Sequence, residues 1–226
     1  MAAVGIGAAR VGERLAGVVA VQGGRVEQRI ERVNLGLATR YRSDDSTVTH
    51  TLFSQPVVPG FTIRPGETRE FPFELPVPHG TPLSLPGSEV WLVTDADIEG
   101  AVDPGDTDGV WIRPSEDMET VIQAAQDLGF RLRHSETEYR FGGVVQELSF
   151  RPPAGPYRLT ELELAFFPAP GGLDLLLEVD RRTTGVASLF TSEVEHRGRW
   201  FVPAALLRQG SEAVARELQG RVQALG

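Results

Sequence analysis

The sequence predicts a mainly β protein built from two tandem β-sandwich domains, residues 1–113 and 114–226, with a helix at each end of the second domain. Short runs of alternating apolar and polar residues recur along the chain. Turn residues separate them at intervals of roughly 8–12 residues, as in β-sandwiches. Only two segments have the 3.6-residue apolar period of a helix, so a parallel sheet with regularly alternating helices is disfavoured.

The first half of the chain is expected to contain only strands. Residues 33–41 alternate with a period of two, and residues 46–53 are a second run rich in β-branched side chains. Residues 70–76 also alternate, but they include two prolines. Since proline cannot donate a backbone hydrogen bond, this strand should lie at a sheet edge. Pro65-Gly66 specifies a type II turn before it, and residues 89–94 form a buried strand.

One helix should separate the two domains. Ser115 is a suitable N-cap, and three acids follow it in the first turn, where the helix dipole favours negative charge. Gly129 then ends the apolar pattern as a C-terminal stop. The domain boundary is therefore expected within residues 112–116.

After this helix the β pattern returns. Three clear alternations cover residues 146–150, 162–166 and 173–179, and residues 193–202 resemble a hairpin closed near Gly198. A final helix capped by Ser211 follows. Its apolar face consists of Val214, Leu218, Val222 and Leu225. That stripe is expected either to dock on its own domain or to bind a partner by lying in a groove.

Composition excludes several classes of function. The net charge is −9 and both halves of the chain are acidic, so neither has the basic footprint of a nucleic-acid-binding domain. All 22 basic residues are Arg, which we interpret as a feature of a GC-rich genome. Cys is absent, which excludes disulfides, thiolate metal sites and a Cys nucleophile. With neither a signal peptide pattern nor 18 consecutive apolar residues, a cytoplasmic protein without a transmembrane segment is expected.

Catalytic and cofactor motifs are not found. The four histidines, His50, His79, His134 and His196, do not stand at metal-ligand spacing. The chain contains no Gly-x-Ser-x-Gly elbow, no phosphate loop and no dinucleotide fingerprint. Glu161 and Glu163 could face one side of a strand as a hydrolytic carboxylate pair, but solvated acids explain them more simply. We therefore expect a protein that is not an enzyme and uses no cofactor and no metal.

The most informative polar feature is an acidic segment, here defined as residues 95–108. It contains Asp95, Asp97, Asp103, Asp106 and Asp108. Three interpretations remain open: solvated loop acids, a calcium site built from carboxylate oxygens, or carboxylates paired with arginines such as Arg113 in a polar cluster between the domains. Pro104 interrupts the EF-hand order, which weakens the calcium interpretation.

Several blocks in the right order connect the chain to a known family. They are Val4-Gly5-Ile6-Gly7 and residues 17–30, 35–41, 63–67, 90–92, 97–98, 101–104 and 176–182. In these blocks the chain resembles the bacterial sporulation-control proteins of the stage-zero-M type. The resemblance implies an arrestin-like pair of β-sandwiches joined by a polar core of Asp and Arg. It also implies a regulatory role through binding to other proteins, without catalysis, in the negative control of early sporulation.

Two departures from the family pattern stand out. Between Arg10-Val11 and Gly12-Glu13 a strand that family members usually carry is missing. An exposed sheet edge would remain there, and such an edge can pair with a strand of a partner or of a second copy, which would give a homodimer. Residues after Thr183 also match the family poorly.

Overall fold

The computed structural model describes residues 2–43, 46–98, 106–155, 157, 159–182 and 193–225. Strands dominate these residues, which confirms the mainly β class. The chain divides into two compact units. The N-terminal unit comprises residues 1–84 and 88–113, and the C-terminal unit comprises residues 85–87 and 114–226.

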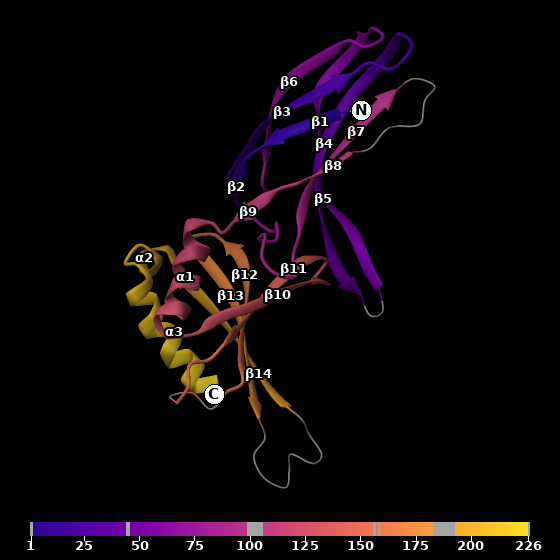
Figure 1. Cartoon of the computed structure of the whole chain (residues 1–226). Helices are drawn as coiled ribbons and strands as arrows, with labels where there is room; N and C mark the ends of the chain where they lie inside the picture. The colour runs from indigo at the N-terminus through magenta and orange to yellow at the C-terminus, as the bar shows by residue number, and fades with distance from the viewer. Residues whose placement is uncertain are drawn as a thin grey trace. The chain divides into compact units, whose positions relative to one another are not determined.

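The N-terminal unit contains two antiparallel sheets and a short parallel pair (Figure 1). The first sheet has the order β1 (Ala2–Ile6), β3 (Arg14–Gln22), β6 (Thr68–Pro76). The second has the order β5 (Ser46–Ile63), β4 (Gln28–Ser43), β7 (Val90–Ile98), β8 (Asp106–Gly109). The parallel pair is β2 (Ala8–Arg10) with β9 (Trp111–Arg113).

The core of this unit follows from the period-2 alternation. Val33, Leu35 and Leu37 of β4 are fully buried. From the other sheet, Leu15 and Leu75 are buried to the same degree. Each such side chain contributes about 1.5–3 kcal/mol when it leaves water, so the two apolar faces are the main source of stability of the unit.

The predicted edge strand is confirmed, because β6 lies at the end of its sheet and pairs with β3 alone within it. The turn before it contains Gly66 with φ of +69°, the left-handed conformation that a type II turn requires at its third position. The edge carries Pro72 and Pro76, which blunt it against further strand pairing.

The C-terminal unit is an antiparallel meander. Its strands are β10 (Arg131–Arg140), β11 (Gly143–Arg151), β12 (Glu161–Ala169), β13 (Gly172–Arg182) and β14 (Glu193–Pro203), hydrogen-bonded in chain order. Three helices lie on one face of this sheet (Figure 1): α1 (Glu116–Asp127), α2 (Ala204–Leu207) and α3 (Ser211–Leu225). Among the described residues, the layer that covers this face of the sheet is therefore helical.

The hairpin predicted near Gly198 is wrong. Residues 193–203 form one continuous strand whose whole length pairs with β13. Gly198 lies in the middle of this strand, and a Cβ there would be 3.1 Å from Leu225 at the end of α3. The glycine therefore permits close approach of a helix instead of making a turn.

The helix between the domains begins and ends as predicted. The Ser115 side chain accepts a hydrogen bond from the backbone N–H of Met118 at 3.3 Å. At the other end Gly129 has φ of +88°, and its N–H donates to Gln126 O at 2.8 Å. This closes the last turn of α1 and directs the chain into β10. None of the helices in the described part of the chain is long and apolar enough to cross a membrane.

Candidate functional site

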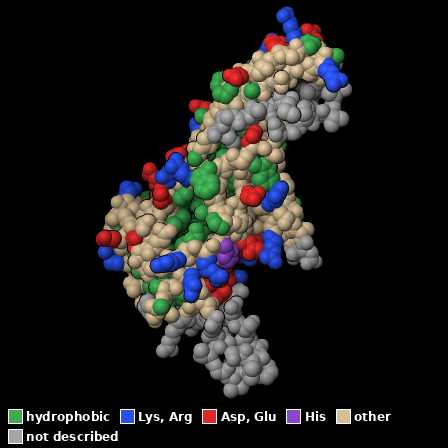
Figure 2. Space-filling view, viewed as in Figure 1, with side chains coloured by type: hydrophobic (Ala, Val, Ile, Leu, Met, Phe, Trp, Pro, Cys, Tyr) green, Lys and Arg blue, Asp and Glu red, His purple; other side chains and the backbone are tan. Residues whose placement is uncertain are grey.

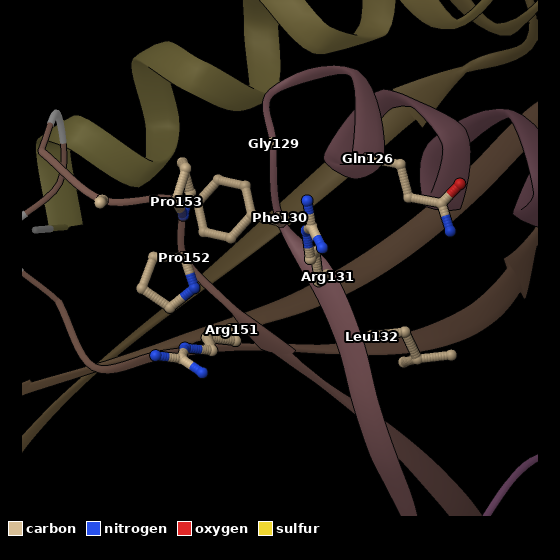
Figure 3. Close-up of a pocket in the computed structure, with 9 residues that line it drawn as sticks. Gln126, Gly129, Phe130, Arg131, Leu132, Arg151, Pro152 and Pro153 are labelled. Atoms are coloured by element: carbon tan, nitrogen blue, oxygen red, sulfur yellow. The ribbon is translucent and has the colours of Figure 1, made fainter.

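A pocket of about 810 Å³ lies in the C-terminal unit where α1 ends (Figure 3). It is lined by Gln126, by residues 129–132 at the start of β10, and by residues 151–154 at the end of β11. We call it the α1-end pocket. Its walls combine apolar side chains with the polar ends of Gln126, Arg131 and Arg151, a mixture typical of ligand and peptide sites.

Local sequence explains why a pocket forms here. Gly129 turns the chain out of α1, and Pro152-Pro153 end the pairing of β11 because neither can donate a backbone hydrogen bond. The buried Phe130 ring anchors this corner against Tyr157, with ring centroids 4.9 Å apart. Burial raises the pKa of the Tyr157 hydroxyl. Phe130 also lines the pocket, so its contact with Tyr157 fixes part of the pocket wall.

Two arginines stand at this pocket as direct neighbours. Arg131 and Arg151 are cross-strand partners in the β10–β11 register, and both are exposed. In the part of the chain that the structure describes, neither guanidinium has an ion pair or a side-chain hydrogen bond. Arginines elsewhere in the unit do: Arg140 contacts Glu147 at 2.6 Å, and Arg197 contacts Glu178 at 2.7 Å. Figure 2 shows blue and red side chains intermingled on one face of the protein.

The face of the sheet opposite the helices carries a second polar feature, which we call the carboxylate row. Ser149, Glu163, Glu178 and Arg197 lie directly opposite one another across β11, β12, β13 and β14. The Glu178 side chain is only 6% exposed and is neutralised by Arg197, while Glu163 accepts a hydrogen bond from the Ser149 hydroxyl at 3.1 Å. Two carboxyl groups are therefore held side by side in a partly dry environment.

This arrangement shifts the protonation of the row. Burial raises the pKa of Glu163 to about 7, and the neighbouring carboxylates of Glu147, Glu178 and Glu161 add to the shift, whereas the hydrogen bond from Ser149 opposes it. Burial also raises the pKa of Glu147, against the attraction of Arg140. Burial and the repulsion between like charges across the strands act in the same direction here. Together they allow Glu163 to keep its proton up to about neutral pH.

Sequence reasoning identified neither feature as a site. The α1-end pocket depends on the cross-strand register of Arg131 and Arg151, which lie 20 positions apart. Glu163 was considered as half of a pair with Glu161, but its nearest cross-strand carboxylate is Glu178. The sequence did contain one local indication of the pocket. An Arg stands close to the end of α1, in Gly129-Phe130-Arg131, and another at the end of β11, in Arg151-Pro152-Pro153.

The acidic segment is only partly described. Asp103 lies outside the described residues, and Asp97 and Asp106 lie in β7 and β8 with side chains that are not described. Asp95 is exposed and accepts a hydrogen bond from the Asn34 amide at 3.4 Å. Asp108 is half-buried and pairs in register with Leu92, while Asp95 follows the buried Thr94 and lies on the other face of β7. The segment therefore spreads its acids over two faces of a sheet.

Two interpretations of this segment concern its possible partners, an arginine or a metal ion. Arg113 is exposed at the end of β9, where it pairs in register with Arg10. A polar cluster of this arginine with the acids, between the domains, stays a prediction. Among the described residues, no three His, Asp or Glu side chains are placed to hold a metal ion.

The apolar stripe of the last helix is used within its own unit. Val214, Leu218 and Val222 are fully buried, and Leu225 is half-buried where α3 reaches Gly198. Helix α3 packs on α1, α2 and β14. The stripe is thus part of the core of its unit, which agrees with docking on its own domain, the first of the two alternatives that the sequence left open.

The predicted strand deletion falls at a tight turn. Gly12 follows β2 with φ of +84°, its N–H donates to Val77 O at 3.0 Å, and a Cβ at this position would lie 2.6 Å from the His79 ring. The chain therefore passes from β2 into β3 directly, over a position that only glycine fits. Pairing of an exposed edge with a partner or a second copy stays a prediction.

Together these observations define a mainly β protein of two units whose distinctive polar features are a pocket with two arginines and a row of carboxylates. Comparison with known proteins is specific. A family model described as SpoOM protein matches residues 1–183, and the chain belongs to this Spo0M family.

Two relatives support this assignment. The sporulation-control protein spo0M of Bacillus subtilis (strain 168) is 39% identical over 207 residues, which cover 82% of this chain and 80% of the relative. The crystal structure of Spo0M from Bacillus subtilis superposes with a TM-score of 0.82 at 32% identity, over 100% of this chain and 98% of that one. The similarity therefore includes both units.

Proposed function

We propose that this protein is a regulator of sporulation that acts as a scaffold, by binding other proteins rather than by catalysis, in the cytoplasm of a bacterium. The observation that carries the proposal is membership of the Spo0M family along residues 1–183, together with a relative named for sporulation control. The named role of that relative is control and not a reaction. The resemblance further suggests that the control is negative and acts early in sporulation.

A complementation assay tests the regulatory role. The gene is expressed at the native level in Bacillus subtilis lacking its own spo0M, and heat-resistant spores are counted. We expect the number of spores to return to that of the parent strain. A matched variant, Leu35→Asp, places a charge at a fully buried position of the N-terminal unit and should fail because it unfolds that unit. No change of the spore count by the intact protein would contradict the proposal.

Dose dependence separates a scaffold from an enzyme. A scaffold acts in proportion to its amount, whereas a catalyst turns over and works when scarce. We expect rescue to decline when expression is reduced about tenfold below the native level of the host protein, because fewer copies are then available to occupy the binding partner. Full rescue at that low level, measured with quantitative immunoblots, would contradict the scaffold mechanism.

The partners that we propose are other proteins, with a second copy of the chain as the alternative. The alternative rests on the sheet edge expected where the chain turns at Gly12. Sedimentation velocity over a wide concentration range tests it: a homodimer gives a sedimentation coefficient that rises with concentration. The calcium-dependent alternative has no support from the family.

A further inference from the structure

The starting point is the pair of arginines at the α1-end pocket. Like charges directly opposite each other on two antiparallel strands destabilise the pair. No acidic side chain among the described residues offsets the charge of Arg131 or Arg151, although Arg140 and Arg197 of the same sheet are each paired with Glu. An anion between the two guanidiniums would remove the repulsion and gain charge-assisted hydrogen bonds.

The surroundings of the pair favour an anion over a cation. Three carbonyl groups in the last turn of α1, those of Ala124, Ala125 and Gln126, already accept hydrogen bonds from the N–H groups of Leu128, Phe130 and Gly129, so they are less available to attract a cation. The remaining polar group of the wall is the Gln126 amide, which can donate as well as accept. Figure 3 shows Gln126, Arg131 and Arg151 among the residues that line the pocket, with Arg131 between the other two in this view.

Size and lining indicate what carries the anion. A volume of about 810 Å³ is far larger than a single carboxylate or phosphate group needs. Leu132, Pro152 and Pro153 provide half-buried apolar walls beside the arginines. A ligand that satisfies both parts has an acidic group with apolar groups next to it, as in a peptide where acidic and apolar side chains follow one another.

We propose that the α1-end pocket binds a short acidic segment of a partner protein, with a carboxylate between Arg131 and Arg151 and apolar neighbours against Pro152 and Pro153. The inference rests on the proposed function, since it names the surface that a scaffold would use. The net charge of −9 gives it selectivity: most of the surface repels an acidic segment, and this pair attracts it locally.

A binding titration with the full chain tests the proposal. The probe is a fluorescein-labelled, end-blocked peptide in which Glu and Leu alternate, and binding is followed by fluorescence anisotropy. We expect saturable binding that weakens as salt is added, because exposed charges are screened. The same peptide with Gln in place of every Glu should bind at least about tenfold more weakly.

Protein variants locate the site. The double variant Arg131→Gln/Arg151→Gln should weaken binding of the Glu peptide about tenfold or more. Arg208→Gln is the matched control, because Arg208 is an exposed arginine at the end of α2 that also lacks an ion pair among the described residues. This control should change affinity less than about twofold. Thermal melting checks the fold, and the double variant should melt no lower than the control, since it removes a repulsion.

Three outcomes would overturn the proposal. The first is equal affinity for the Glu and Gln peptides. The second is equal loss of affinity in the double variant and in the Arg208 control. The third is a phosphoserine peptide of the same length that binds more than about tenfold tighter than the Glu peptide, which would assign the pocket to phosphate instead.

The spore assay distinguishes this inference from the proposed function. If the intact protein restores spores and the double variant restores them equally, regulation stands and the pocket inference fails. If the intact protein restores nothing, the proposed function fails whatever the peptide titration shows. Restoration by the intact protein and by the Arg208 control, but not by the double variant, supports both.

Discussion

The two units cover their sheets in different ways. In the N-terminal unit two sheets supply the buried apolar faces, whereas in the C-terminal unit helices α1–α3 cover one face of a five-stranded meander. The other face of that meander carries the carboxylate row. A sheet that faces helices on one side concentrates its apolar residues there and leaves the opposite side to polar groups.

The difference is visible in two ion pairs of almost equal length. Arg14 and Glu74 of the N-terminal unit are 2.8 Å apart, with side chains 61% and 62% exposed. Arg197 and Glu178 of the C-terminal unit are 2.7 Å apart, but Glu178 is only 6% exposed. The N–O distance alone would suggest that the two pairs contribute equally to stability. Burial makes the second one costly to break, because a carboxylate deprived of its partner stays out of water.

The largest loss of unfolding free energy should come from weakening the packing of the helical layer on its sheet. Leu218→Ala deletes a fully buried side chain of α3 and should lower the free energy of unfolding by about 2–5 kcal/mol. Hydrogen exchange followed by mass spectrometry should show faster exchange in peptides of the C-terminal unit. Leu35→Ala, at an equally buried position of the N-terminal unit, is the matched control and should affect that unit instead. Unchanged exchange around α3 would contradict the comparison.

Much of the fold could be predicted because its signals are local. Alternation over residues 162–166 and 173–179 corresponds to β12 and β13, and Ser115 with Gly129 fixed both ends of α1. Gly198 was misread as a turn because a glycine in a strand has two physical uses. One is a turn and the other is close approach of a neighbouring element, and only the position of Leu225 decides between them.

The candidate sites could not be predicted in the same way. The carboxylate row and the arginine pair depend on which residues face each other across strands. That register cannot be predicted from the sequence of one strand alone. Glu163 and Glu178 have ordinary sequence neighbours, and only strand pairing brings them together. The acidic segment, by contrast, was conspicuous in the sequence, yet the structure places Asp95 and Asp108 on different faces of a sheet.

The next effect in size concerns the two ion pairs. Arg197→Gln should cost about 2 kcal/mol of unfolding free energy, because it leaves Glu178 buried without its cation. Arg14→Gln should cost less than about 0.5 kcal/mol, since both members of its pair are exposed. Urea unfolding at pH 7.5 measures both. Equal costs would show that burial does not distinguish the two units.

The smallest effect should be the pH dependence of the carboxylate row. The folded pKa of Glu163 is about 7, above its ordinary value of 4.5, so folding favours the protonated form. The stability that this provides is complete below pH 4.5 and is lost as the pH rises through 7. Glu163→Gln mimics the protonated carboxyl and removes the loss. Between pH 6 and 8.5 the variant should therefore gain about 1 kcal/mol over the wild type, after allowance for water that reaches a half-buried group. Urea unfolding at several pH values measures the gain.

Glu74→Gln, at an exposed carboxyl of the N-terminal unit, is the control and should show no such trend. A pH-independent difference for Glu163→Gln would mean that this carboxyl is ionised throughout, and that the row is no drier than the surface of the other unit.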